Sequence, residues 1–198
     1  MLPLFIGRIK MSLKFKEFKF VYISLDYLKV LHDIDPEIFY INNPLYEKKP
    51  HLGILVNKDN RKYVIPLTSA KEKHKTWDDV TATNYLIYEI INLETDVIDD
   101  EDIIVDIKNK ELLRQKNIPI EEYEKYKKRI LSVLEIKKMF PIKDGVYTYV
   151  DINQKDGLED DEFKRRGLMN KEYRFCLKIR NELEMMLKRK QIKYMINK

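Results

Sequence analysis

The side chains best suited to chemistry lie in one stretch, from Tyr63 to His74, with the sequence Tyr-Val-Ile-Pro-Leu-Thr-Ser-Ala-Lys-Glu-Lys-His. Its first five residues alternate with the period of a β-strand, and Pro66 suits the end or the edge of such a strand. Thr68 and Ser69 should therefore stand where the strand gives way to a turn. Two hydroxyls, their backbone N–H groups and the lysines that follow can converge there on one anion, as binding of a phosphate requires. The alternative is that Ser69 only caps a turn and the lysines are solvated.

A predicted hairpin positions these groups. Residues 51 to 56 and 61 to 67 have the character of two strands, and the Asn-Lys-Asp-Asn segment between them tolerates turn geometry. The start of one strand and the end of its antiparallel neighbour lie at the same end of a sheet. We therefore expect Lys49 to be a neighbour of Thr68 and Ser69.

The other elements are predicted from periodicity and from turn residues. Residues 18 to 24 should form a first strand, followed by a short helix that ends before Pro36. Residues 84 to 88 suit another strand, and the apolar spacing between Glu121 and Leu134 is helical. We interpret about 90 to 130 as an inserted, mainly helical excursion with an acidic loop, followed by strands near 132 to 140 and 146 to 152. A polar linker, 153 to 161, precedes a final helix from about Tyr173.

Composition bounds the class of protein. The chain has 198 residues, 44% hydrophobic and 36% charged, which indicates one globular domain. We expect residues 1 to 17 to be an N-terminal extension of this domain. Translation is expected to start at Met1 or at Met11. Residues 164 to 198 hold twelve Lys or Arg, whereas residues 94 to 106 hold seven acids and no base. A separated basic end favours a polyanionic partner. The lone Cys176 suggests a buried thiol in a reducing cytoplasm, and no apolar run is long enough to span a membrane.

Several segments together resemble a known family. They are Val21-Tyr-Ile-Ser, Tyr46 with Lys49-Pro50 and Gly53-Ile-Leu, Pro66-Leu-Thr-Ser-Ala-Lys71 with His74, Leu134 to Ile142, and Val146 to Ile152. They resemble the ToxN/AbiQ toxins of type III toxin–antitoxin systems, with roughly 78 to 129 outside the match. Ala70 stands where some relatives have proline.

The resemblance implies a fold, an activity and a partner. The fold would be α+β, a bent antiparallel sheet of about five or six strands with a barrel-like core as in the MazF and CcdB toxins, flanked by helices. The activity would be metal-independent, sequence-specific cleavage of mRNA by 2′-hydroxyl attack, leaving 2′,3′-cyclic phosphate and 5′-hydroxyl ends. The partner would be a pseudoknotted repeat RNA antitoxin in a closed protein–RNA ring, with growth arrest and abortive phage infection as the biological role. No cofactor, metal, membrane or DNA is implied.

Roles can be assigned to particular side chains. Lys49, Thr68, Ser69 and Lys71 are the candidate catalytic residues, because charge on a phosphorane needs cations and neutral donors. The general base stays open between Tyr46, His74 and a lysine of lowered pKa. The candidate RNA-binding residues come from the segments around the predicted hairpin and from the basic final helix. The alternative for the helix is that its charges form a solvated face. The candidates are Tyr46, Lys48, Lys73, His74, Lys178, Lys188 and Arg189.

Two other interpretations remain. One is a toxin of similar fold held by a protein antitoxin, and the other is a non-catalytic module whose hydroxyls only hold phosphate. The acidic run from Asp99 to Asp102 invites a magnesium site. Consecutive acids point in different directions, however, and metal-ligand spacings are absent from the sequence, so a solvated loop is favoured.

Overall fold

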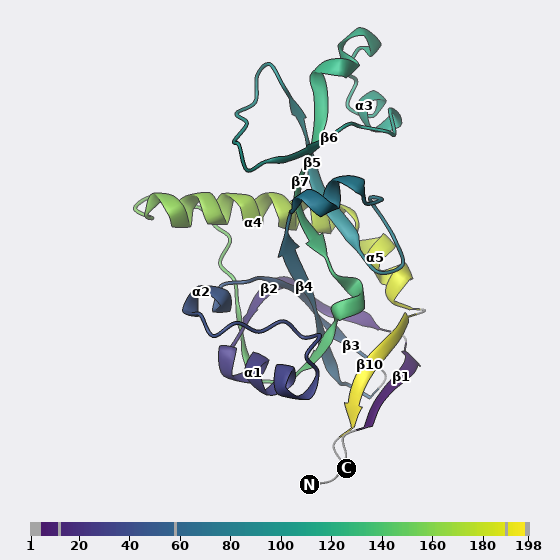
Figure 1. Cartoon of the computed structure of the whole chain (residues 1–198), viewed down its shortest axis with the longest axis vertical. Coiled ribbons are helices and arrows are strands. Elements are labelled where there is room, and N and C mark those ends of the chain that lie inside the picture. The colour runs from purple at the N-terminus through teal and green to yellow at the C-terminus, as the bar shows by residue number, and fades with distance from the viewer. Residues whose placement is uncertain (1–4, 12, 58, 189, 197–198) are drawn as a thin grey trace.

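The fold is built on a bent antiparallel sheet of eight strands (Figure 1). The computed structural model describes residues 5–11, 13–57, 59–188 and 190–196. Six strands form one open row in the order β5-β7-β4-β3-β2-β9, while the short β6 and β8 pair with β7 and β4. The bounds are β2 Lys14–Ile23, β3 His51–Val56, β4 Lys62–Ser69, β5 Tyr85–Asn92, β6 Ile103–Val105, β7 Tyr126–Leu134, β8 Phe140–Ile142 and β9 Tyr147–Tyr149.

The predicted α+β class with a bent antiparallel sheet is confirmed, but the expected five or six strands are eight. The row ends at β5 on one side and at β9 on the other, so it does not close into a barrel. A separate two-stranded sheet joins β1, Phe5–Met11, to β10, Lys190–Ile196, in antiparallel register. The first strand of the main sheet begins at Lys14, earlier than the predicted residue 18.

Helices cover the sheet. They are α1 Leu25–Ile34, α2 Pro44–Glu47, α3 Glu111–Arg114, α4 Asp160–Lys178 and α5 Arg180–Leu187, with 3-10 turns η1 Glu72–Thr76, η2 Ile120–Lys125 and η3 Ile136–Lys138. The predicted α1 is confirmed, whereas the final helix starts at Asp160, well before Tyr173, and the chain past Lys190 is a strand. The first turns of α4 are polar, so periodicity did not reveal them. Within the described residues, no helix is long and apolar enough to cross a membrane.

The hairpin of β3 and β4 is confirmed, with His51 opposite Pro66 and Val56 opposite Lys62. Pro66 was expected at the end or the edge of a strand; it lies inside β4, at the point where the partner along one edge changes from β8 to β7. Beyond it β4 pairs with β7, from Leu67 opposite Leu134 to Ser69 opposite Ser132. The missing N–H of proline is tolerated at such a change of partner. Thr68 and Ser69 are accordingly the last two residues of the strand.

The helix expected between Glu121 and Leu134 is wrong, because 126–134 is β7. Only the short α3 and η2 are helical between residues 90 and 130, so the predicted mainly helical excursion is also wrong. β7 lies between β4 and β5 and pairs with both. Pairing along both edges of a strand outweighs a helical spacing of apolar residues that is only local.

The core lies on both faces of the sheet. On one face, side chains of β2 to β5 and β7 pack against Met169 and Cys176 of α4 and Leu183 and Leu187 of α5. On the other face, α1 packs through Leu28 and Leu31 against β2, β3, β4 and β8. Cys176 is a buried free thiol, as predicted. Figure 1 shows α4 running across the sheet and α1 lying next to α2.

Candidate active site

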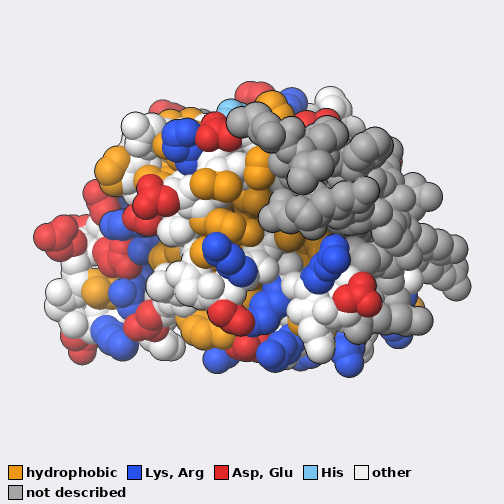
Figure 2. Space-filling view, turned by 90° about the horizontal axis from the view of Figure 1, so that it is seen from below, with side chains coloured by type: hydrophobic (Ala, Val, Ile, Leu, Met, Phe, Trp, Pro, Cys, Tyr) orange, Lys and Arg blue, Asp and Glu red, His pale blue; other side chains and the backbone are white. Residues whose placement is uncertain are grey.

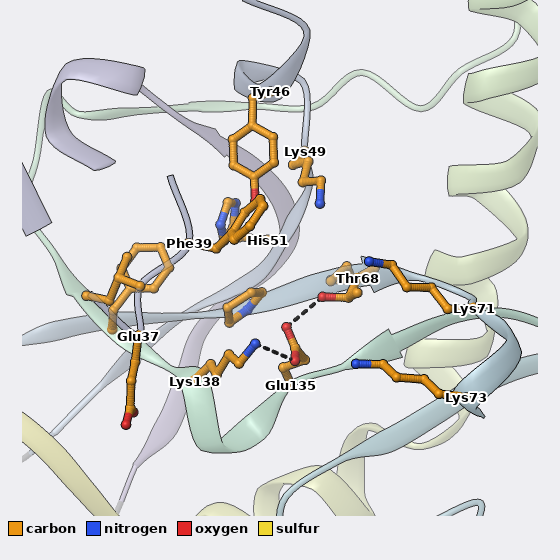
Figure 3. Close-up of a pocket in the computed structure, with 14 residues that line it drawn as sticks. Glu37, Phe39, Tyr46, Lys49, His51, Thr68, Lys71, Lys73, Glu135 and Lys138 are labelled. Carbon is orange, nitrogen blue, oxygen red and sulfur yellow. Dashed lines mark hydrogen bonds and ion pairs between the residues drawn. The ribbon is translucent and has the colours of Figure 1, made fainter. Parts of the chain in front are cut away.

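A pocket opens on the α1 face of the sheet, at the edge where β3 begins and β4 ends (Figure 3). Its volume is about 160 Å³. Lys49 and Thr68 both line it, so the neighbourhood predicted from the hairpin is present. The lining residues are Glu37, Ile38, Phe39, Tyr46, Lys49, His51, Pro66, Leu67, Thr68, Lys71, Lys73, Glu135, Lys138 and Phe140.

Thr68 is held by a carboxylate that follows β7. Its hydroxyl donates to Glu135 Oε2 at 2.6 Å, and Lys138 Nζ lies 2.9 Å from Glu135 Oε1. The β4–β7 register makes Thr68 and Glu135 diagonal neighbours on one face of the sheet, which places their side chains within reach. Although burial opposes it, these partners hold the pKa of Glu135 below its ordinary value. Glu135 is therefore a carboxylate at neutral pH.

The Ser69 side chain points away from the pocket, because successive strand residues point to opposite faces of the sheet. Ser69 is exposed, sits opposite Ser132 and is not among the pocket's lining residues. Its backbone N–H is better placed. Ala70 N–H donates to Leu131 of β7 while Leu67 N–H donates to Pro50, so the alternation directs the N–H of Ser69 toward the Lys49–Pro50 edge.

Lys49 projects into the pocket between two aromatic rings. Its Nζ lies 4.6 Å from the ring centroid of Tyr46 and 5.3 Å from that of Phe39. Burial, and then the positive charge of Lys71, lower the pKa of Lys49. Burial raises the pKa of Tyr46, so its phenol is protonated at neutral pH. Of these two groups, Lys49 is the one that loses its proton more easily than in water, so its neutral amine is available at lower pH.

Lys71 and Lys73 enter the pocket from the segment that follows β4, and Figure 3 shows their amino groups pointing toward Thr68 and Glu135. His74 does not line the pocket. Its ring is buried, and Nδ1 accepts the backbone N–H of Lys71 at 3.0 Å. Burial and the charge of Lys73 lower the pKa of His74. A neutral imidazole thus fixes the backbone of Lys71 and does not meet a ligand in the pocket.

Sequence reasoning missed several pocket residues. Glu135 and Lys138 follow a strand that was predicted as helix, so nothing placed them near Thr68. Phe39 lies in a loop where its aromatic character was the only signal. His51 was treated as the start of a strand; it is buried against Phe140, and burial lowers its pKa to about 4.

Other predicted residues lie elsewhere. Lys48 is exposed beside Lys49 without lining the pocket, Lys178 and Lys188 are exposed at the ends of α4 and α5, and Arg189 is outside the described residues. Much of the basic charge of α4 and α5 is paired within the chain, in Arg165–Glu162, Arg166–Asp151, Lys171–Glu89 and Arg180–Glu184.

Acidic and basic side chains are also mixed on the surface. In the acidic run, Asp102 pairs with Arg129 at 2.8 Å. Figure 2, seen from below, shows both signs of charge around an exposed hydrophobic strip on that face. Because positive and negative side chains are mixed on this face, a polyanion would be attracted only where lysines and arginines gather locally.

The charge of the pocket is locally positive. Four lysines line it, Lys49, Lys71, Lys73 and Lys138, against two carboxylates, Glu37 and Glu135. One of the carboxylates is bound by Lys138. A concave site with surplus ammonium groups, a fixed hydroxyl and aromatic walls suits a phosphate that carries a base or sugar.

A family model described as toxin ToxN, type III toxin–antitoxin system, matches residues 19–198. The chain belongs to this ToxN toxin family. The match includes every residue that lines the pocket, and it also spans residues 78 to 129, which the sequence interpretation had left outside the resemblance. No curated protein matches the chain.

Solved structures share the ToxN fold of this chain. A toxin of a bacterial type III system, selectively inhibited by a non-coding RNA pseudoknot, matches with a TM-score of 0.56 and 17% identity over 87% of this chain and 76% of that one. AbiQ, a lactococcal anti-phage endoribonuclease of a type III system, gives 0.55 and 14% over 86% and 78%. A structure from a bacterial antiviral system regulated by a processed non-coding RNA gives 0.53 and 18% over 85% and 81%.

Proposed function

We propose that this ToxN-family chain is an endoribonuclease toxin that cleaves single-stranded RNA in the cytoplasm and is inhibited by a structured RNA antitoxin. The proposal rests on one observation above the others: Lys49, Thr68 and Lys71 meet in a single positive pocket. Family membership supports it, as does the description of AbiQ as an anti-phage endoribonuclease. Growth arrest that limits phage infection is the corresponding biological role.

Lys49 is the general base of the proposed reaction. RNA can be cleaved without metal when its own 2′-hydroxyl attacks the adjacent phosphorus in line with the departing 5′-oxygen. A lysine accepts the proton of that hydroxyl only when its pKa is lowered, and burial together with Lys71 has this effect on Lys49. Tyr46 stays protonated and His74 is turned away, so neither competes for the role.

Lys71 protonates the leaving group and, with Lys73, stabilises the phosphorane. As the P–O5′ bond breaks, the Lys71 ammonium gives one proton to the 5′-oxygen, which leaves 2′,3′-cyclic phosphate and 5′-hydroxyl ends. The N–H of Ser69 points to the same edge and adds a neutral donor. Thr68 donates its hydroxyl hydrogen bond to Glu135, so its oxygen presents lone pairs to the substrate. These lone pairs accept a hydrogen bond from the attacking 2′-hydroxyl and orient it.

The antitoxin is proposed to inhibit by covering this pocket. The relative with an inhibitory RNA pseudoknot shares the fold, and a polyanion would be attracted by the four pocket lysines. Assembly into a closed ring with that RNA would keep every copy of the toxin occupied.

The test compares Lys49→Ala and Lys71→Ala with Lys116→Ala, a change of an exposed lysine outside the pocket. Each purified variant is incubated with single-stranded RNA, with and without EDTA, and the RNA ends are mapped. We expect the first two to lose about 10²- to 10⁴-fold in rate, the loss typical of a missing general acid or base, and the control to keep the wild-type rate. Wild-type activity that disappears in EDTA, or 5′-phosphate products, would contradict the mechanism.

A further inference from the structure

A second hollow lies beside the pocket, and η1 separates the two. Lys73 of η1 lines the pocket, whereas its neighbours His74 and Lys75 line the hollow. The hollow measures about 600 Å³. Its apolar surface is formed by side chains from β5, β6, β7 and the segment after η1, namely Trp77, Val80, Leu86, Val105 and Ile130.

The charged groups of this hollow cancel one another. Three lysines, Lys75, Lys108 and Lys128, face three aspartates, Asp78, Asp79 and Asp106. Lys128 Nζ donates to both carboxylate oxygens of Asp79, at 2.7 and 2.6 Å, and Asp106 is 2.6 Å from Lys127 Nζ. An anion therefore gains little there, in contrast to the positive pocket next to it. A flat, neutral group with an aromatic face is the better match.

Trp77 connects the two sites. The Nζ of Lys73 lies 5.7 Å from the centroid of the Trp77 ring, while Lys73 itself lines the pocket. The His74 ring meets Trp77 edge-on at 4.6 Å, and the same His74 holds the backbone of Lys71. A polynucleotide whose phosphate sits between Lys71 and Lys73 would thus carry a neighbouring base past Lys73 to Trp77.

We propose that this hollow binds an unstacked base of the substrate RNA, close along the strand to the cleaved phosphodiester, with Trp77 as its stacking surface. The inference rests on the proposed function, because the phosphate must occupy the pocket for the base to reach the hollow. It also gives a role to part of the chain between 90 and 130: β6 and the Asp106–Asn109 segment form one wall of the hollow. Stacking on an aromatic ring tolerates any base, while the amide nitrogen of Asn109, whose oxygen accepts the N–H of Glu111, supplies a donor for selecting one.

The first test uses Trp77 as its own probe, since it is the single tryptophan of the chain. Eight-nucleotide 2′-O-methyl oligomers of each base are titrated into the protein, and tryptophan fluorescence is followed; they cannot be cleaved, because the attacking hydroxyl is blocked. We expect a saturable change with one or more single-stranded oligomers and none with the corresponding duplex, whose bases stay stacked. No change with any of the four, or an equal change with duplex, would overturn the proposal.

The second test asks whether Trp77 acts on RNA or only supports His74. Trp77→Ala and Trp77→Phe are compared on a cleavable RNA and on versions shortened from each end. We expect Trp77→Ala to lower kcat/KM about tenfold or more on the full-length RNA, Trp77→Phe to retain most activity, and shortening from one end to remove the difference. An equal loss on every length would show a structural role and refute the base site. If wild type cleaves no RNA, the proposed function fails while the fluorescence result still decides this inference.

Discussion

The hydroxyl of Thr68 donates its single hydrogen bond to Glu135, and this determines what Thr68 can offer a ligand. With the proton engaged at 2.6 Å, the outward side of its oxygen carries lone pairs. Donors to a phosphate must then come from the ammonium groups of Lys71 and Lys73 and from the backbone N–H of Ser69. Lys138 completes the arrangement by pairing with Glu135, so its charge is partly used inside the protein. The pocket thus separates groups that accept from groups that donate.

The charges around Lys49 should set the pH dependence of cleavage. Lys71 lowers the pKa of Lys49 and Glu135 raises it. Because the base must be deprotonated, activity should rise with pH through the pKa of Lys49. Lys71→Ala removes a like charge, raises that pKa and should move the rising limb of log(kcat/KM) to higher pH, whereas Glu135→Gln should move it to lower pH. The two shifts should therefore be opposite in direction.

Opposite shifts in these two variants would distinguish a titrating Lys49 from general damage to the pocket. Lys116→Ala is the control and should leave the limb in place. If the rising part of the pH profile of log(kcat/KM) does not move in either pocket variant, or moves in the same direction in both, Lys49 is not the general base.

At the scale of elements, the change of partner along β4 builds the pocket. β4 pairs with β3 along one edge up to Pro66, and along its other edge it pairs first with β8 and then, from Leu67, with β7. The end of β4 therefore brings the start of β3 and the end of β7 to one place. The hairpin was predictable because its turn and its alternation are local. The position of β7 was not, since its neighbours on both sides are distant in sequence. This is why Lys49 and Thr68 were placed correctly while Glu135 was missed.

Gly53 is the position in β3 at which a side chain should be least tolerated. Its φ is +72°, and an added Cβ would lie 2.4 Å from Cε1 of the buried Phe15 on β2. Gly53→Ala combines backbone strain with overpacking and should lower the free energy of unfolding by about 2 to 4 kcal/mol. Gly145→Ala is a matched control, because φ is +83° but a Cβ meets nothing within 4 Å. Its cost should be about 1 kcal/mol.

Urea denaturation of both glycine variants measures the difference. Equal costs would mean that backbone strain alone accounts for Gly53 and that Phe15 moves aside without penalty.

At the scale of the whole molecule, the two faces of the sheet have different tasks. One face holds α1, α2 and the pocket, and the other is covered by α4 and α5 around the buried Cys176. The sequence predicted Cys176 as buried and the helix as basic, but not that its charges pair with Glu89, Asp151 and Glu162. Such pairs join segments whose spatial order only the complete sheet determines. Basic composition at the end of the chain therefore does not by itself show how much free positive charge the helix presents.

Glu172 of α4 should make the stability of the whole molecule depend on pH near neutrality. Its carboxyl is buried in the layer between α4 and the sheet, and burial raises its pKa to about 7 from an ordinary 4.5. A raised pKa means that the folded state holds a proton which the unfolded state releases. The stabilisation is thus complete below about pH 4.5 and is lost as pH rises through 7, by an amount on the order of 3 kcal/mol.

Glu172→Gln keeps the shape of the side chain without the charge, so it should remove this loss. In urea denaturation at pH 5 and pH 8, the variant should approach wild type at the lower pH and exceed it by about 2 to 3 kcal/mol at the higher pH. Glu101→Gln, a change in the exposed acidic loop, should follow wild type at both. If Glu172→Gln instead loses as much stability as wild type between the two pH values, Glu172 is ionised in the folded state, and the α4 layer must admit a partner or water to its carboxylate.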